Sequence, residues 1–183
     1  MNQEKIEALI KELLAEIGED PGREGLLETP KRVAKSFSKL YGGYGKDPKD
    51  IITVFDNEGY DEMVIAKDIE FYSMCEHHML PFFGKAHIGY VPNKKIIGLS
   101  KMPRLVEVFA RRLQNQERLT KQIASTLNDV LGPKGVGVII EASHFCMMAR
   151  GVEKQSCIMS TSSFTGLFLK DSRTRSEFLH LIK

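Results

Sequence analysis

Apolar residues recur at intervals of three and four along the first part of the chain, which is the pattern of amphipathic helices. The first predicted helix covers residues 6–17 and ends before Gly18. Thr29 is predicted to cap a second helix, with Pro30 at its first helical position, and this helix stops at Gly42. The chain is therefore expected to begin with a helical arm.

Two further helices and a closing helix are predicted in the second half of the chain. Ser100 is suited to cap a helix over residues 101–113, and apolar residues from 119 to 131 form the stripe of the next helix. Residues 178–182 supply the apolar face of the last helix.

Between the helices the apolar period changes to two, as expected for strands. The predicted strands run from Met63 into Cys75, over residues 82–90, over residues 135–146 and within residues 156–168. Residues 44–60 are expected to form a loop. Strand pairs separated by helices favour an α+β domain with an antiparallel sheet over a doubly wound parallel sheet. The chain has no GxGxxG or Walker motif, so the sequence gives little support to a dinucleotide or P-loop site.

Composition and charge exclude several classes of protein. Of the 183 residues, 42% are hydrophobic and 27% are charged, as in ordinary globular proteins. The net charge of +2 gives no reason to expect binding to nucleic acid or to a membrane. No window approaches the roughly 18 consecutive apolar residues of a membrane span, and the acidic start does not resemble a signal peptide. A cytoplasmic location is therefore expected, and the three cysteines do not suggest a disulfide framework.

Two distant segments carry residues with the spacing of metal ligands. Cys75 and His78 are three residues apart at the end of a predicted strand, so both can reach one ion from a single turn. His144 and Cys146 are two apart on a predicted strand, so both side chains are expected to point to the same face. Cys75, His78 and Cys146 would form a catalytic zinc site with three protein ligands and a fourth position open to water.

Other interpretations of the same residues remain open. The cysteines can be buried core thiols, or the zinc can be structural, with His77 or His144 as a fourth ligand. The functional interpretation is favoured because His77 and His144 lie beside the ligands without being needed to hold the ion. Histidines next to an activated water are natural proton carriers, since their pKa lies near neutrality.

Four basic residues are candidates for binding a polyphosphate. Lys101 and Arg104 lie in the first turn of the helix after Ser100, where free backbone N–H groups favour an anion. Arg150 follows Cys146 by four residues, and Arg32 lies in the first turn of the second helix. Each of these residues, taken alone, is more often a solvated surface cation.

Gln116 and Glu117 begin the next predicted helix. A carboxylate beside an amide matches the guanine edge, where N1–H and the exocyclic amine donate side by side. The alternative is an acidic first turn stabilised by the helix dipole.

Longer blocks of the sequence are similar to a known family. The segments CEHHMLPFFGKAHIGYVP, IGLSKMPRLVEVFARRLQNQERLT and SHFCMMARGVEKQ resemble the motifs of GTP cyclohydrolase I, in the same order. Together with ETPKRVAKSF near the start and TRSEFL near the end, the similarity covers nearly the whole chain. Two departures are Cys157, where no family cysteine is expected and which is interpreted as an ordinary thiol, and a short N-terminus.

The resemblance implies a fold, an assembly and a reaction. The implied fold is the tunnelling fold, an antiparallel sheet with helices packed on one face, and the implied assembly is a toroidal homodecamer. Residues 1–60 would form the N-terminal helical region and residues 61–183 the catalytic domain. The implied reaction converts GTP and water to formate and 7,8-dihydroneopterin triphosphate, the first step towards folate or tetrahydropterin.

The resemblance also assigns roles to residues, which are carried over by matching motifs. It implies zinc ligation by Cys75, His78 and Cys146, proton transfer by His77 and His144, guanine binding by Gln116 and Glu117, a place near the ribose for Ser100, and triphosphate binding by Lys101, Arg104, Arg150 and Arg32, the last from a neighbouring subunit. In the expected chemistry, activated water attacks C8 of GTP after His144 protonates N7. The rival functions are another tunnelling-fold enzyme acting on purines or pterins, such as a deazaguanine reductase, and a non-catalytic zinc module.

Overall fold

The structure, a computed structural model, describes residues 1–183 and divides into two compact units, residues 1–42 and residues 43–183. The N-terminal unit contains α1 (Gln3–Glu16), the 3₁₀ turn η1 (Glu24–Leu26) and α2 (Thr29–Leu40), and its two long helices pack against each other. The structure thus confirms both predicted helices. The functional division at residue 60 stays a prediction.

The predicted cap of α2 is wrong. Thr29 is already the first helical residue, and the cap position belongs to Glu28, which makes no side-chain capping bond. The Thr29 hydroxyl donates instead to the Gly25 carbonyl oxygen at 3.5 Å. Pro30 is still at the start of the helix, where its missing N–H costs nothing.

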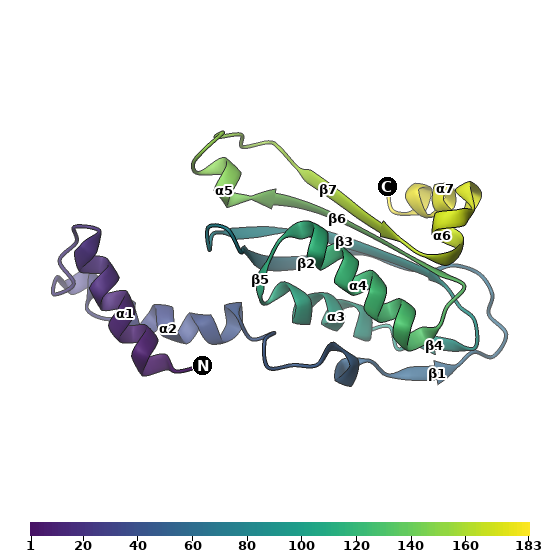
Figure 1. The fold of residues 1–183 in the computed structure, drawn as a ribbon, viewed down its shortest axis with the longest axis horizontal. Helices are drawn as coiled ribbons and strands as arrows, with labels where there is room; N and C mark the ends of the chain where they lie inside the picture. Colours follow the sequence, from purple (N-terminus) through teal and green to yellow (C-terminus); the bar gives the residue numbers. More distant parts are fainter. The chain divides into compact units, whose positions relative to one another are not determined.

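The second unit is built on a five-stranded sheet with the strand order β5-β2-β3-β6-β7 (Figure 1). Its strands are β2 (Val64–Cys75), β3 (Pro81–Val91), β5 (Leu113–Gln114), β6 (Gly135–His144) and β7 (Met159–Phe164). All neighbours are antiparallel except β2 and the short β5. This confirms the α+β class and the antiparallel sheet, and it confirms the long strands predicted from the period of two.

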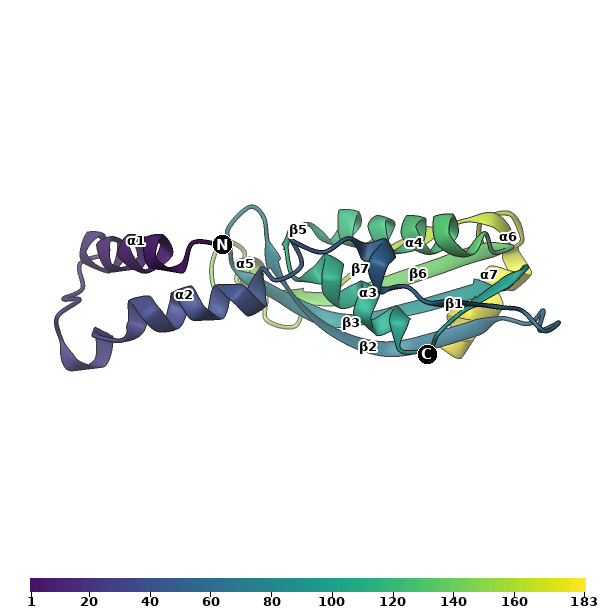
Figure 2. The same ribbon diagram turned by 90° about the horizontal axis from the view of Figure 1, so that it is seen from below.

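Two helices cover one face of this sheet, namely α3 (Lys101–Ala110) and α4 (Gln116–Leu131) (Figure 2). Every second residue of β3 and β6 faces them, and the resulting core is fully buried at Phe82, Ala86, Val138 and Ile140. Gly132, in the left-handed conformation at φ +53°, ends α4. The predicted amphipathic stripes therefore bury against the predicted strand faces.

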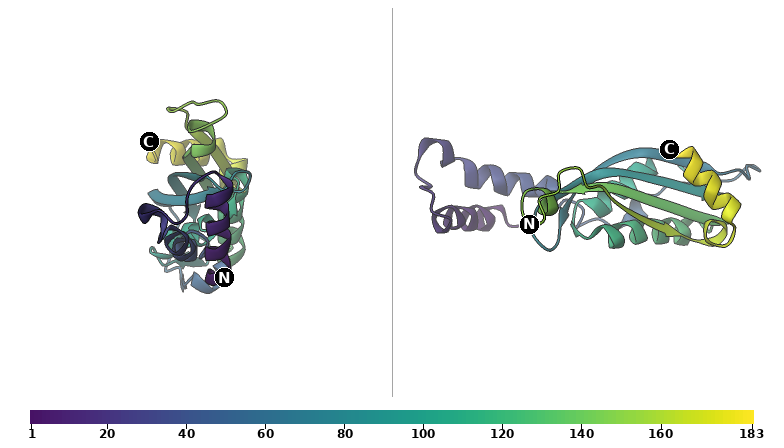
Figure 3. Two further views of the ribbon diagram at one scale, coloured as in Figure 1. Left: turned by 90° about the vertical axis from the view of Figure 1, so that its left-hand side faces the viewer. Right: turned by 90° about the horizontal axis from the view of Figure 1, so that it is seen from above.

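The opposite face of the sheet is covered at one end by α6 (Gly166–Lys170) and α7 (Ser172–Leu181) (Figure 3). Phe168 and Phe178 form a second small core there with Val91 and Ile139. Gly137 makes room for it, since a Cβ on this residue would lie 2.5 Å from the Phe168 ring.

Several short elements were not predicted. The segment 44–60, expected to be a loop, contains the 3₁₀ turn η2 (Pro48–Ile51) and β1 (Val54–Asp56), which pairs with β4 (Lys95–Ile97). The short helix α5 (Phe145–Met148) follows β6 directly. Across both units, no helix is long and apolar enough to span a membrane.

Phe178 anchors the closing helix, and we expect Phe178→Ala to destabilise the protein by about 3–5 kcal/mol because it leaves a cavity in the small core. The measurement is urea unfolding followed by circular dichroism at a fixed protein concentration. Leu179→Ala is the matched control, since Leu179 is the next residue of α7 and is 39% exposed. Equal losses in the two variants would contradict the anchoring role.

Candidate metal centre and catalytic pocket

The first segment with predicted metal ligands is the turn between β2 and β3 (residues 75–81), which is called the metal turn below. β2 ends at the buried Cys75, and β3 starts at Pro81. The turn is closed by two backbone hydrogen bonds, from Cys75 N–H to Leu80 O and from Met79 N–H to Cys75 O, both 2.8 Å. Met79 adopts a left-handed conformation at φ +53°, which a side chain other than glycine rarely takes.

The second segment follows β6, and here the sequence interpretation needs a correction. His144 and Cys146 do not lie on one strand face, because β6 ends at His144 and Cys146 belongs to α5. The helical turn, rather than a strand alternation, directs the Cys146 thiol. The two segments are neighbours because Phe82, just after the first turn, pairs with His144 across β3 and β6.

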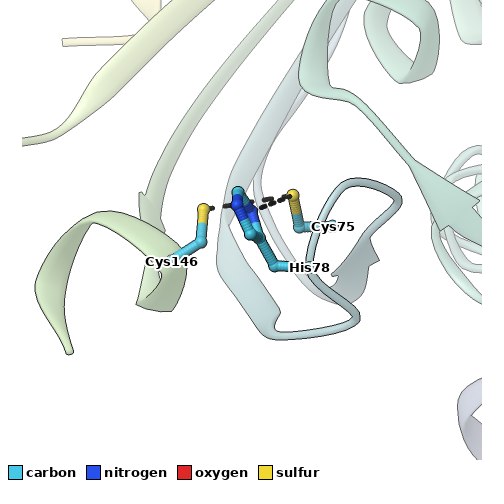
Figure 4. Close-up of side chains that lie close together, drawn as sticks. All are labelled: Cys75, His78 and Cys146. Atoms are coloured by element: carbon cyan, nitrogen blue, oxygen red, sulfur yellow. Dashed lines mark hydrogen bonds between the residues drawn. The ribbon is translucent and has the colours of Figure 1, made fainter. Parts of the chain in front are cut away.

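Three potential ligands converge where these segments meet (Figure 4). The Sγ atoms of Cys75 and Cys146 lie 3.9 Å apart, and His78 Nδ1 lies 3.9 Å from Cys75 Sγ. One donor atom of each residue lies within 4.8 Å of the others. Both cysteines are free thiols. The predicted set Cys75, His78 and Cys146 therefore forms a group that could bind a metal ion.

The surroundings of the Cys146 thiol disfavour its ionisation. Burial raises the pKa of the Cys146 thiol, and the nearby Cys75 raises it further. A cation between the two sulfur atoms would reverse this effect, because a metal ion favours the thiolate form of both.

A pocket of about 180 Å³ is lined by two of the three donor residues, Cys75 and Cys146. Its lining includes residues from the metal segments, from the start of α4 and from β7: Cys75, His77, Gln114, Asn115, Gln116, Glu117, His144, Cys146, Met147, Met159 and Thr161. The structure thus brings His77, His144, Gln116 and Glu117 together around the donors, as the sequence indicated. Larger hollows lie elsewhere on the surface, but none of them contains these groups.

His144 is held on two sides. Its ring stacks on Phe82 with ring centres 4.6 Å apart and planes 2° from parallel, and its Nε2 lies 2.8 Å from Gln116 Oε1. Burial lowers the pKa of His144, while the carboxylate of Glu117 partly opposes this effect. The ring is therefore mostly neutral near pH 7.

Gln116 determines which nitrogen of His144 carries the proton. The Gln116 side chain is almost fully buried, and its Nε2 donates to the carbonyl oxygens of Ile140 and Met159, both at 2.9 Å. An amide facing two carbonyl groups must present its nitrogen to them, so its oxygen faces His144. Nε2 of His144 is then the donor, and Nδ1 is the nitrogen left with a free lone pair.

Within one chain, only one of the four predicted phosphate-binding cations lies beside the metal group. Arg150 lies beside the metal group, with a guanidinium nitrogen 2.8 Å from His78 Nε2. Ser100, Lys101 and Arg104 lie at the start of α3, beside β4, whereas α3 ends next to β5 and the metal turn (Figure 1). Ten helical residues separate the ends of α3 by roughly 15 Å. Arg32 belongs to α2 in the N-terminal unit.

Sequence reasoning missed several residues that shape the pocket. Glu76 and Arg118 form an ion pair between the metal turn and α4, and Asn115 donates to the same carboxylate at 2.8 Å. The Arg118 guanidinium and Asn115 amide lower the pKa of Glu76. The capping role of Asn115 could have been recognised in the sequence, because Asn115 directly precedes an apolar helical stripe, and it caps α4 by accepting from Arg118 N–H. The ion pair leaves no pattern in the sequence, because its partners are 42 residues apart.

Comparison with known proteins assigns the chain to a family. The sequence profile of GTP cyclohydrolase I matches residues 6–183. This chain belongs to the GTP cyclohydrolase I family.

Individual relatives agree with this assignment. The chain is 59% identical over 186 aligned positions to the GTP cyclohydrolase 1 of Wolinella succinogenes, with both chains fully covered. It is 62% identical to that of Chlorobaculum tepidum over 93% of this chain and 76% of the relative. Among solved structures, the archaeosine synthase QueF-Like in the apo form matches 57% of this chain and 93% of its own, with a TM-score of 0.45 and 12% identity. That likeness is too distant to add to the assignment.

Replacing one thiol tests the metal group. We expect Cys146→Ala to lose bound metal, because two donors hold an ion far more weakly than three. Elemental analysis after gel filtration measures the metal content per chain. Cys157→Ala is the matched control, since Cys157 is exposed and lies outside the group. Unchanged metal in Cys146→Ala would remove Cys146 from the ligand set.

Proposed function

We propose that this chain converts GTP and water to formate and 7,8-dihydroneopterin triphosphate, using a zinc ion held by Cys75, His78 and Cys146. The observation that carries the proposal is the convergence of two thiols and an imidazole beside a pocket that also holds His77, His144 and Glu117. Membership of the GTP cyclohydrolase I family supports GTP as the substrate. The product would enter folate or tetrahydropterin synthesis, and we infer a cytoplasmic location for this enzyme.

The donor group fits zinc. Thiolate and imidazole are the ligands that zinc prefers, and Zn–S distances near 2.3 Å in a tetrahedral site put two sulfur atoms about 3.8 Å apart. The thiols of Cys75 and Cys146 lie 3.9 Å apart. Three protein ligands leave one position for water, the arrangement of catalytic sites. A zinc ion there supplies Lewis acidity, which makes water a competent nucleophile near neutral pH.

Guanine recognition is assigned to the first turn of α4. The carboxylate of Glu117 lines the pocket and can accept hydrogen bonds from N1–H and the exocyclic amine. Gln116 lies at the floor of the same pocket, where its amide is already engaged with His144 and two carbonyl groups. Gln116 therefore contributes to guanine binding mainly by holding His144 in place.

Proton transfer to the guanine ring is assigned to His144. Nδ1 of the neutral ring first takes up a proton from solvent and then passes it to N7, which restores the neutral ring with Nε2–H donating to Gln116. Protonated N7 withdraws electrons from C8, which favours attack by water there, and a second hydrolysis releases the carbon as formate. His77 and Ser100 would serve the later proton transfers near the ribose.

Triphosphate binding requires more than one copy of the chain. Arg150 is beside the metal group, but Lys101 and Arg104 lie at the far end of α3. We therefore assign Lys101, Arg104 and Arg32 to sites completed by neighbouring subunits of a homodecamer. The helical rise places Lys101 roughly 14 Å and Arg104 roughly 9 Å from Ala110, where α3 ends next to the metal turn, and this separation supports the sharing.

Incubation with GTP tests the function directly. We expect equimolar formate and a fluorescent pterin product, and a zinc chelator should abolish both. His144→Ala should retain zinc, but its rate of formate release should fall by about a hundredfold or more, because the substitution removes the proton donor for N7.

His180→Ala is the matched control, since His180 lies on α7, away from the pocket lining. Activity of His144→Ala within about tenfold of the parent would exclude His144 as the proton donor. A pterin product that forms only with added NADPH would instead indicate a reductase.

A further inference from the structure

The metal turn has little packing of its own. The side chain of His77 is 65% exposed, Met79 is 51% exposed, and His78 is also exposed. A ligand turn with such weak packing would move freely unless another part of the molecule held it. Besides the two hydrogen bonds that close the turn, the turn's backbone makes one hydrogen bond to a neighbouring strand, from Glu76 N–H to Gln114 O at 2.9 Å.

Arg150 contacts His78 at the outer side of the turn, and the side chain of Glu76 attaches the turn to α4. Both of its carboxylate oxygens are bound by the segment that starts α4. Asn115 Nδ2 donates to Oε1 at 2.8 Å, and the guanidinium of Arg118 donates to Oε2. Because both oxygens are engaged, the carboxylate has one orientation, and the turn that carries it has one position relative to α4.

Arg118 is itself held rigidly. Its Nε donates to Gln114 Oε1 and its Nη2 to Leu113 O, both at 2.9 Å. The Gln114 side chain is 1% exposed and donates in turn to Phe109 O and to Gln122 Oε1. The planar guanidinium thus joins a buried amide, a backbone carbonyl and the Glu76 carboxylate, which a lysine cannot do.

The segment that holds Glu76 also carries the guanine-facing residues. Gln116 and Glu117 lie between Asn115 and Arg118 in the same helical turn. Glu76, in turn, lies between the metal donor Cys75 and the pocket residue His77. The Glu76–Arg118 ion pair with its supporting hydrogen bonds therefore adds a side-chain link, next to the backbone pairing of Cys75 with Gln114, between the metal donors and the segment that carries Glu117.

We propose that Arg118 is a positioning residue, which acts through Glu76 to fix the metal-bearing turn at the distance from Glu117 that the reaction needs. The catalytic part of this inference rests on the proposed function. Water attacking C8 must approach a guanine ring held by Glu117, and a displacement of about 1 Å can cost a hundredfold in rate. Arg118 touches neither the metal donors nor the substrate in this assignment.

The test is a double-mutant cycle with Arg118→Gln, Glu76→Gln and the double variant. Loss of the ion pair should leave guanine binding largely intact, so kcat should fall by about tenfold or more while KM for GTP changes less than about threefold. If the two residues act through each other, the double variant should be no worse than either single variant. Arg118→Lys should resemble Arg118→Gln, because a lysine keeps the charge but lacks the planar fork.

Two further readouts do not depend on turnover. Hydrogen exchange of the amides of residues 75–80, measured on the metal-loaded protein without GTP, should become about tenfold faster in all three variants. Zinc retention in competition with a chelator should weaken, since Cys75 and His78 are no longer held in place. The control pair is Arg173→Gln and Asp171→Asn, which removes an ion pair at the start of α7, away from the pocket lining, and should leave every readout unchanged.

Each outcome decides the inference. Additive losses in the cycle, unchanged exchange in residues 75–80, or full recovery by Arg118→Lys would overturn it. If Arg118→Gln does not fold, Glu76→Gln alone supports the inference by faster exchange and lower kcat, and overturns it by the absence of both. If the parent protein releases no formate from GTP, the proposed function fails, while hydrogen exchange and zinc retention still decide the role of Arg118.

Discussion

The pairing of β3 with its two neighbours is the interaction on which the site depends. β3 pairs with β2 from Pro81 opposite Met74 and with β6 from Phe82 opposite His144. These two registers place the C-terminal ends of β2 and β6 at the same end of the sheet, although Cys75 and Cys146 are 71 residues apart. A slip of one residue between β3 and β6 would turn His144 away from α4 and would also expose the apolar side of β6. Burial of the core thus enforces the register that the chemistry needs.

The start of α4 is the second element that organises the site. Successive residues of a helix are rotated by about 100°, so Gln116, Glu117 and Arg118 face three different directions. Gln116 points inward to His144, Glu117 lines the pocket, and Arg118 reaches the metal turn. Asn115 caps the helix and also binds Glu76. One helical turn therefore serves the substrate, the proton-transfer histidine and the metal segment.

The fold could be predicted from the sequence where the elements are long. The alternation in β3 and β6 and the apolar stripes of α3 and α4 give clear periods, because each covers several turns or pleats. β1, β4 and β5 have two or three residues each, too few for any period to show.

The metal donors could be predicted from their spacing, but the position of Cys146 could not. The strand period ends at His144 with no sequence signal, and α5 has only four residues. Contacts between side chains distant in the sequence, such as Glu76 with Arg118, leave no local pattern at all.

The pairing that leads into α4 also limits how this chain can vary in length. One residue inserted or deleted between Arg111 and Asn115 would shift Leu113 and Gln114 out of register with Met74 and Cys75 at the end of β2. The first turn of α4 would then be displaced from the turn between β2 and β3. In contrast, the loop 57–62 lies outside the regular elements, and length changes there leave the sheet register intact. Length variation among natural relatives is therefore expected in that loop and not before α4.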